Sequence, residues 1–441
     1  MQNSFLKVAH PLREIIQRRP STKRGHLVLF GELFNRGYAN GLVEEAQAAQ
    51  FKIIKSTVGR RDSDQNLRAL ETSEYPTDCD HFINVPLEAG FDFEKDEHGL
   101  SPVDDLKELG LKNWSEFKWR PGKLDYCRQK GRERFRKSVQ DYVKKLENTL
   151  EGQLGGQILI AHLMAGGVPR AKIAMPLMNR VFKGTGDRYM PSREFWSSSI
   201  GQLSEMNFIE VTAQTLDILI EETSELRKKI KSAGGHISYV AYGYHGTEIW
   251  YRGGYNWQSY SPYLQGWAKM ALEDVAARWL KENVAVSVYN CPEILTNSSS
   301  IFQGVEVPLY ALIRAFQKSF PDHGRTHQIV AEATQLLKKP QLLEEINSLI
   351  DSFYAHPEVM ATLQFDEWPS HSNRTQLEKL LSISEQIVEC HSDSKKLMTA
   401  LLSEIVFRSC GKAMFHDSFQ PQAAAQWIGH DLVASLEVGR T

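Results

Sequence analysis

Short runs of branched apolar residues alternate with helical segments along the first two thirds of the chain, and this alternation restricts the fold more than any other feature. The runs are "HLVLF" (26–30), "KIIKSTV" (52–58), "DHFINVPL" (80–87), "GQILIAHLMAGG" (156–167), "HISYVAYGY" (236–244) and "VAVSVYN" (284–290). Strands that alternate with helices in this way are typical of βαβ units and of a mostly parallel sheet. We therefore predict an α/β fold that binds its ligands at the carboxyl ends of the strands.

Two parts of the chain depart from this alternation. The segment 91–122 is rich in Pro, Gly, Trp and charged residues, which indicates an insertion or a long connection. From about Leu309 the strand-like runs stop and the apolar spacing becomes helical. We expect residues 1–320 to form one enlarged domain and residues 321–441 a helical C-terminal region. That region could be a lid over the site, a layer on the sheet edge or a separate unit.

The composition excludes several classes of function. The chain of 441 residues has 52 basic and 54 acidic side chains, a net charge of −2, so it has no global attraction to nucleic acid or to anionic membrane. Its 5 cysteines form no CxxC pair, which predicts free thiols and no metal site. The first 25 residues contain no secretory signal, and no apolar run is long enough to span a bilayer. We expect a soluble, cytoplasmic protein.

Glycines follow the first predicted strand in "FGELFNRGYANG", at Gly31, Gly37 and Gly41. Glycines between a strand and a helix let backbone amides approach a pyrophosphate, although this spacing is not GxGxxG and also suits a flexible turn. The second strand is followed by Arg60 and Arg61. Arginine at this point accommodates the 2′-phosphate of NADPH, which favours NADPH without excluding NADH. Solvated surface arginines are the competing interpretation.

The stretch "QSYSPYLQGWAKMALE" (258–273) combines tyrosine and lysine near a predicted helix start. Ser261 as N-cap and Pro262 as first helical residue would leave Tyr260 in the preceding loop, with Lys269 about two turns inside the helix. A tyrosine in the loop can turn toward the same pocket as the lysine, whereas Tyr263 is fixed in the first turn. A nearby ammonium lowers the pKa of a phenol and improves it as a donor to developing negative charge. A tyrosine-rich surface helix is the alternative.

Longer blocks of the sequence resemble a known family. The run "SYVAYGYHGTE…SYSPYLQGWAKMALEDVAARW…NCPEILTNSSSIFQGVEVPLY" is similar to FabV-type enoyl-acyl carrier protein reductases, which are enlarged short-chain dehydrogenase/reductases with a Tyr–eight residues–Lys motif. The blocks "LFGELFNRGYANGLVEEA", "STVGRRD" and "HLMAGGVPRAKIAMPLMNRVFKGTGDR" resemble more closely the triclosan-tolerant FabMG group. The resemblance covers about 25–337. The glycine loop departs from the FabV pattern, and "WYRGGYNWQ" separates Tyr244 from Tyr260.

The resemblance implies a Rossmann-type, doubly wound α/β domain that reduces trans-2-enoyl thioesters on acyl carrier protein or coenzyme A, with NADPH or NADH. It implies that Tyr260 donates to the enolate oxygen, that Lys269 orients the cofactor ribose and that Tyr244 assists. The expected cofactor-binding residues are Gly31, Gly37, Tyr38, Gly41, Arg60, Arg61, His162, Thr296, Asn297 and Ser298. Because acyl carrier protein is acidic, a basic docking patch is expected at Arg170, Lys172, Arg180, Lys183 and Arg188. The oligomeric state stays open, and a FabV-like monomer fits the resemblance.

Other functions remain open at this point. A trans-2-enoyl-CoA reductase would use the same residues. A carbonyl reductase of the same fold is another enzymatic alternative, although Tyr244 stands where serine would be expected. A non-catalytic dinucleotide-binding protein would not need Tyr260.

Overall fold

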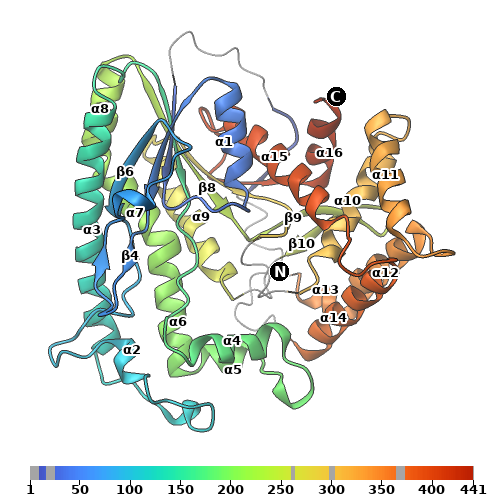
Figure 1. Cartoon of the computed structure of the whole chain (residues 1–441), viewed down its shortest axis with the longest axis horizontal. Helices are drawn as coiled ribbons and strands as arrows, with labels where there is room; N and C mark the ends of the chain where they lie inside the picture. The colour runs from blue at the N-terminus through green and yellow to red at the C-terminus, as the bar shows by residue number, and fades with distance from the viewer. Residues whose placement is uncertain (1–8, 16–24, 260–263, 297–302, 364–372, 441) are drawn as a thin grey trace.

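An eight-stranded sheet organises the protein, whose computed structural model describes residues 9–15, 25–259, 264–296, 303–363 and 373–440 (Figure 1). The strands lie in the order β1 (His10–Leu12), β12 (Ala425–Ile428), β11 (Val286–Asn290), β8 (His236–Gly243), β7 (Gln157–His162), β2 (His26–Phe30), β3 (Lys52–Thr57) and β6 (His81–Pro86). Every neighbouring pair is parallel. The chain builds the sheet outward from β2 in one direction and then from β7 in the other. This is the doubly wound Rossmann order, so the predicted fold class and all six predicted strands are confirmed.

Both faces of the sheet are buried, which explains why its strands read as continuous apolar runs. In β2, Leu27 and Leu29 pack into one core, and Val28 and Phe30 pack into the core on the opposite face. All four side chains are fully buried. Because successive side chains of a strand point to opposite faces, one short apolar run contributes side chains to both cores.

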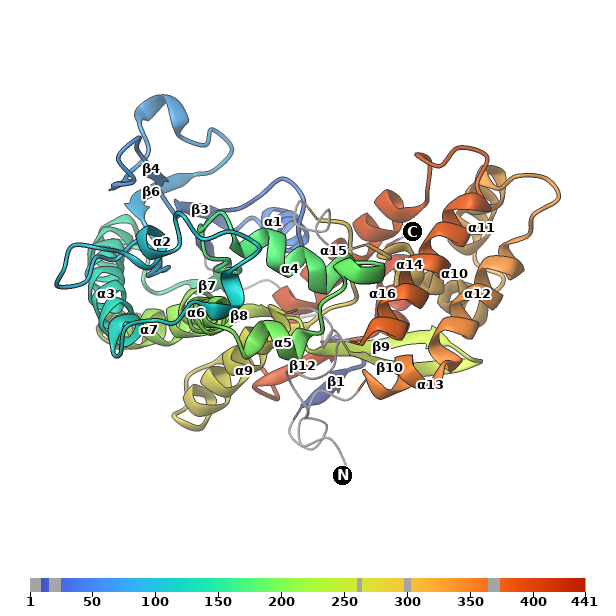
Figure 2. The ribbon, with the colours of Figure 1, turned by 90° about the horizontal axis from the view of Figure 1, so that it is seen from below.

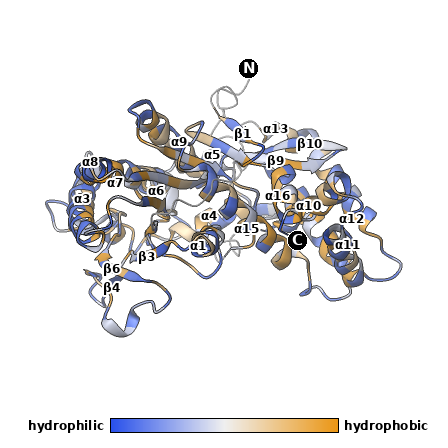
Figure 3. Cartoon of the chain, turned by 90° about the horizontal axis from the view of Figure 1, so that it is seen from above, coloured by the Kyte–Doolittle hydropathy of each residue, from blue (hydrophilic) through white to orange (hydrophobic). Residues whose placement is uncertain are grey.

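Helices cover each face. The first face carries α1 (Ala39–Ala48), α10 (Glu306–Ser319), α15 (Thr399–Asp417) and α16 (His430–Val438). The second carries α3 (Lys123–Thr149), α7 (Thr215–Glu222), α8 (Ser224–Ser232) and α9 (Gly266–Lys281). Figure 3 shows polar residues gathered along α3 and α8 at the outer edge. In the described part of the chain, no helix has the length and apolarity needed to cross a membrane.

A third layer lies beyond the carboxyl ends of the strands. It contains α4 (Ala174–Lys183), α5 (Ser192–Trp196) and α6 (Ser199–Ile209), which share one apolar cluster, and α2 (Pro102–Asp105), whose C-cap residue Leu106 joins that cluster. The predicted insertion 91–122 contributes Phe91, Leu106 and Trp114 to this cluster. The layer therefore covers the carboxyl edge of the sheet, where ligands are expected to bind.

An antiparallel hairpin of β9 (Gly246–Tyr251) and β10 (Gly254–Ser259) follows β8, where the sequence analysis assigned no strands. Its two-residue turn has positive φ at Arg252 (52°) and Gly253 (80°), the geometry of a tight hairpin turn. The hairpin extends from the sheet to the C-terminal helices (Figure 2). Tyr251 stacks on Tyr354 there, with ring centroids 4.2 Å apart.

The C-terminal region is not purely helical, so the expectation that strands stop near Leu309 is wrong. After α11 (Gly324–Leu336), α12 (Leu343–Ala355), α13 (Pro357–Ala361) and α14 (Arg374–Glu389), the chain returns through α15 and adds β12 between β11 and β1. The strand has only four residues, "AQWI", which is too short to show a strand pattern. The region packs on the sheet and, through α12–α14, reaches the site as well.

Candidate functional site

Two cavities open near the carboxyl edge of the sheet, where doubly wound folds bind ligands. The first, here called the β3 cavity, has a volume of about 220 Å³ and lies between the end of β3 and the loop from β2 to α1. Its described lining includes Glu32, Phe34, Asn35, Asn40, Lys55, Ser56, Thr57, Arg60, Glu74, Asp78 and Phe82. The second cavity lies at the end of β11. Three strands, β2, β7 and β8, end between the two cavities.

The turn after β2 requires glycine at its first position. Gly31 has φ +110°, and an added Cβ would lie 3.1 Å from Sδ of Met164. Its amide donates to Oγ of Ser56 at 3.0 Å, which fixes the loop against β3. Gly37 has open space around it, whereas Gly41 is packed in α1 with its Cβ position 2.0 Å from the Phe407 carbonyl oxygen. The structure thus accounts for Gly41 by the close contact of α1 with α15.

Both arginines predicted near the cofactor are paired with carboxylates. Arg60 donates through both terminal nitrogens to the two oxygens of Glu32, each at 2.9 Å. Burial alone would raise the pKa of Glu32, but the hydrogen bonds and charge of Arg60 outweigh it and hold that pKa below its usual value. Arg61 pairs with Glu88 and lies 4.5 Å above the ring of Phe93. The Arg61 side chain is only 15% exposed, whereas the Arg60 side chain is 40% exposed with both terminal nitrogens engaged by Glu32.

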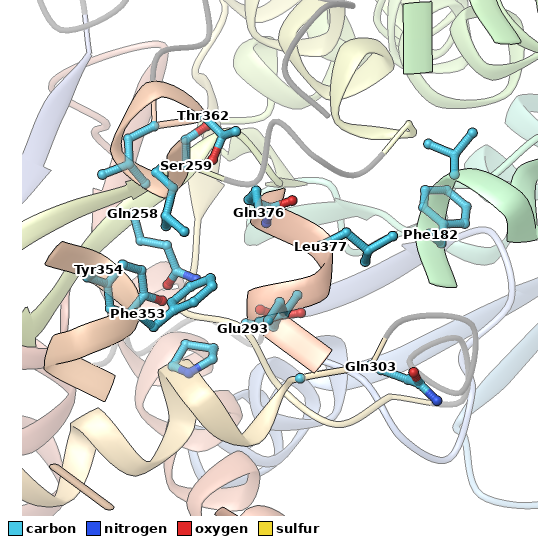
Figure 4. A pocket seen from close by; sticks show the side chains of 16 residues that line it. Phe182, Gln258, Ser259, Glu293, Gln303, Phe353, Tyr354, Thr362, Gln376 and Leu377 are labelled. Carbon is cyan, nitrogen blue, oxygen red and sulfur yellow. Dashed lines mark hydrogen bonds between the residues drawn. The ribbon is translucent and has the colours of Figure 1, made fainter. Parts of the chain in front are cut away.

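The second cavity, here called the hairpin cavity, is shown in Figure 4. Its polar lining is Gln258, Ser259, Glu293, Gln303, Thr362 and Gln376, and its apolar lining includes Val181, Phe182, Pro308, Phe353, Val359, Leu363, Leu377 and Leu380. These residues come from α4, β10, the segment after β11, α10 and the region of helices α12–α14. The C-terminal region therefore forms one wall of a mostly apolar cavity beside the sheet edge.

Tyr244 contacts a carboxylate that lines the hairpin cavity. It follows the last residue of β8, and its hydroxyl donates to Oε1 of Glu293 at 3.2 Å. Glu293 is only 5% exposed and lines the cavity. Glu293 is not among the residues predicted from the sequence, although it is an isolated acid in the apolar stretch "CPEIL" directly after a strand.

Lys269 lies in the first turn of α9, and its ammonium donates to the Tyr242 carbonyl oxygen at 2.6 Å. Burial lowers the pKa of this lysine to about 8, although the charges of Glu273 and Cys291 act in the opposite direction. The lysine thus stands at the carboxyl end of β8 with a pKa near the working range of an enzyme.

The predicted start of the helix at Ser261 and Pro262 is not what the structure shows. Within the described residues α9 begins at Gly266, one turn later, after a turn at Leu264 and Gln265. Leu264 is fully buried in the apolar cluster of the third layer, which fixes the chain just before the helix. Ser–Pro also starts turns, so the local signal was ambiguous. Tyr260 lies outside the described residues, as do Asn297 and Ser298.

A buried polar network holds the ends of β8 and β11 against α9. Nδ1 of His245 lies 2.8 Å from Oε2 of Glu273, and the Asn290 amide donates to Oε1 of the same carboxylate at 2.7 Å. The Asn290 side-chain oxygen accepts the His245 backbone amide at 2.6 Å. Glu273 is one turn beyond Lys269 on α9, so the network also fixes the helix that carries the lysine.

Two further candidates have definite places. Tyr38 stacks on Tyr242 with centroids 5.7 Å apart, and its hydroxyl donates to the Pro292 carbonyl oxygen at 2.7 Å. His162 ends β7 with Nε2 2.8 Å from the Thr215 hydroxyl. Burial, aided by the charge of Lys269, lowers the pKa of His162 to about 3, so its ring is neutral.

Thr296 closes the described segment after β11. Among the predicted site residues, the structure brings Tyr244, Lys269 and Tyr38 to the ends of β8 and β11 through their contacts with Glu293, Tyr242 and Pro292.

The predicted basic patch lies mainly on the outer side of α4. Arg180, Lys183 and Arg188 line a groove of about 530 Å³ together with Leu111, Pro176 and Asp187. Arg170 does not join them, because it pairs with Glu88 and stacks over Phe93. Lys172 is exposed just before the helix. The inner side of the same helix contributes Val181 and Phe182 to the hairpin cavity.

The doubly wound sheet and the glycine turn after β2 define a Rossmann-type protein, a class that binds dinucleotides at the carboxyl edge of the sheet. The chain belongs to the FabMG family of enoyl-acyl carrier protein reductases, because the family profile described as "Enoyl-acyl carrier protein reductase FabMG" matches residues 8–436. The resemblance drawn from the sequence is thereby confirmed, and the chain is an enzyme of this class.

Two solved structures agree with this assignment over the whole chain. An apo structure of FabMG, described as a novel type of enoyl-acyl carrier protein reductase, is 37% identical, with a TM-score of 0.92 and 98% of each chain covered. An NADH-bound structure of FabMG is 34% identical, with a TM-score of 0.78, covering 99% of this chain and 100% of the other. No match is found among curated protein sequences.

Proposed function

We propose that this enzyme reduces trans-2-enoyl thioesters on acyl carrier protein with NADH, and that the two cavities hold the two reactants. The observation that carries the proposal is the order of features along the sheet edge. The β3 cavity lies at the end of β3, Lys269 at the end of β8, and the hairpin cavity beyond it at the end of β11. An NADH-bound relative of the same family supports the choice of nucleotide.

The residues present fit a dinucleotide laid along this edge. The β3 cavity is polar and suits an adenosine ribose, and the positive φ of Gly31 (+110°) and its tight approach to Met164 disfavour a side chain in this turn. The amides that precede α1 would face a pyrophosphate, which the helix N-terminus favours. The ammonium of Lys269 would hold the nicotinamide ribose. When bound, NADH supplies the hydride.

The acyl chain would occupy the hairpin cavity, whose walls are mainly apolar. Addition of hydride to the β-carbon leaves negative charge on the thioester oxygen, and Tyr260 would donate a hydrogen bond to that oxygen. A donor aimed at a developing oxyanion contributes about 3 kcal/mol. Tyr244, oriented by Glu293, would assist from the end of β8. Tolerance of triclosan stays a prediction from the family resemblance.

The proposal is tested by following NADH oxidation with trans-2-enoyl thioesters on acyl carrier protein and on coenzyme A, with product masses measured. We expect a saturated acyl product, with a lower KM for the carrier-bound substrate. A preference for the coenzyme A thioester would favour a trans-2-enoyl-CoA reductase. Reduction of ketones but of no enoyl thioester would overturn the proposal.

A further inference from the structure

We infer that Glu32 is the residue that selects NADH over NADPH, both by accepting the adenosine ribose 2′-hydroxyl and by keeping Arg60 paired. This inference rests on the proposed function, since it concerns the nucleotide which the reductase uses. It reverses the expectation drawn from Arg60 and Arg61 in the sequence.

The carboxylate of Glu32 is fixed in the β3 cavity from several sides. Besides both nitrogens of Arg60, it accepts the Thr57 hydroxyl at 3.1 Å and lies 3.5 Å from the Val58 amide. Its side chain is 20% exposed, so one edge remains open to the cavity. The turn at Gly31 places the next residue, Glu32, beside the carboxyl end of β3, although Glu32 itself follows β2.

A carboxylate at this place discriminates between the two nucleotides. In doubly wound folds an acid near the end of the second strand binds the ribose 2′-hydroxyl, and it repels a 2′-phosphate. Here the end of β3 reads Ser56, Thr57, Val58, without an acid. The nearby Asp62 is occupied by its own turn, where it accepts the amides of Asp64 and Asn66. Glu32 is therefore the carboxylate best placed to read the ribose.

The cations of the described cavity lining are both matched by acids. Lys55 pairs with Asp78 at 2.6 Å, and Arg60 pairs with Glu32. Just beyond them, Arg68 pairs with Glu74 at 2.7 Å. A 2′-phosphate would have to share one of these cations with its acid, and it would then lie against that carboxylate. Both effects oppose NADPH.

The test compares NADH and NADPH in equilibrium binding and in kcat/KM for wild type, Glu32→Gln and the double variant Glu32→Gln/Arg60→Ala. Glu32→Gln should raise the ratio of NADPH to NADH use by roughly tenfold or more, because it removes the repulsion and releases Arg60. The double variant should lose that gain, since Arg60 would be the group that takes the phosphate. An unchanged ratio in Glu32→Gln, or a gain that survives the loss of Arg60, would overturn the inference.

Two further variants serve as controls. Glu44→Gln removes one negative charge from α1, where Glu44 pairs with Arg408 outside the lining of the β3 cavity, so its ratio should stay near that of wild type. An equal shift there would mean a general charge effect and would contradict a specific role of Glu32. If Glu32→Gln folds poorly, Glu32→Asp is measured in its place. It keeps a carboxylate in the cavity, so it should keep the preference for NADH. Failure of wild type to bind either nucleotide would refute the proposed function itself, whereas binding without a shift would refute only this inference.

Discussion

At the scale of single residues, the site depends on charged groups held where water is scarce. Lys269 is the clearest case, because desolvation brings the pKa of its ammonium down to about 8. Glu273, one turn along α9, and Cys291, after β11, both raise that pKa, while the neutral ring of His162 adds no charge. The lysine is protonated below pH 8 and loses its charge as the pH rises through that value.

This pKa predicts a pH dependence. If the ammonium holds the nicotinamide ribose, kcat/KM for NADH should fall as the pH rises above about 8. Lys269→Arg keeps the charge at every accessible pH, since arginine does not deprotonate in proteins. The variant should therefore lose the alkaline fall even if its overall rate is lower. The same alkaline fall in Lys269→Arg would show that another group is titrating.

At the scale of elements, strands were easier to predict than the contacts between them. Five of the six predicted strands, β2, β3, β7, β8 and β11, are mostly buried runs, because both faces of the sheet are covered there, whereas the edge strand β6 alternates half-buried and buried residues. The hairpin β9–β10 was missed, since polar and aromatic residues such as Asn256 and Trp257 give it no clear alternation. β12 was missed because four residues carry too little pattern.

The site was predictable only where chemistry and spacing coincide. Lys269 was found by its distance in sequence from Tyr260. Glu32, Glu293 and Glu273 were not found, because their roles depend on partners far along the chain. Glu32 meets Arg60, and Glu273 meets His245 and Asn290, only after the strands align.

The contact between α1 and α15 gives a prediction about stability. A Cβ at Gly41 would lie 2.0 Å from a backbone oxygen of α15, so Gly41→Ala should lower the free energy of unfolding by about 1–3 kcal/mol, or more. Gly37→Ala adds its methyl group to open space and should leave the thermal midpoint unchanged. Thermal unfolding of the two variants checks this pair. Equal midpoints would contradict a packing role for Gly41.

The two sides of α4 predict a selective effect on carrier protein. Reversing charge at Arg180, Lys183 and Arg188 should raise KM for the carrier-bound substrate by roughly tenfold, because an acidic partner would lose its complementary groove. The coenzyme A thioester should be affected much less. Arg170 is left intact, since its removal would leave Glu88 short of a partner. Equal effects on both substrates would rule out docking at this groove.

At the scale of the whole molecule, the C-terminal region joins the sheet and the site. β12 completes the sheet, α15 and α16 cover one face, and α12–α14 form a wall of the hairpin cavity. The sequence left open a lid over the site, a layer on the sheet edge and a separate unit. The structure shows a region that packs on the sheet and also lines the hairpin cavity. The β3 cavity and the hairpin cavity lie along one edge of the sheet, at the ends of β3 and β11, with Lys269 between them at the end of β8.

The most direct test of this account is turnover of a trans-2-enoyl thioester by wild type, Tyr260→Phe and Tyr263→Phe, with the Kd for NADH measured for each protein. The account predicts that Tyr260→Phe loses about a hundredfold in kcat while it still binds NADH, because only the donor to the enolate oxygen is gone. Tyr263→Phe should stay close to wild type. Full turnover by Tyr260→Phe, or the larger loss in Tyr263→Phe, would contradict the account.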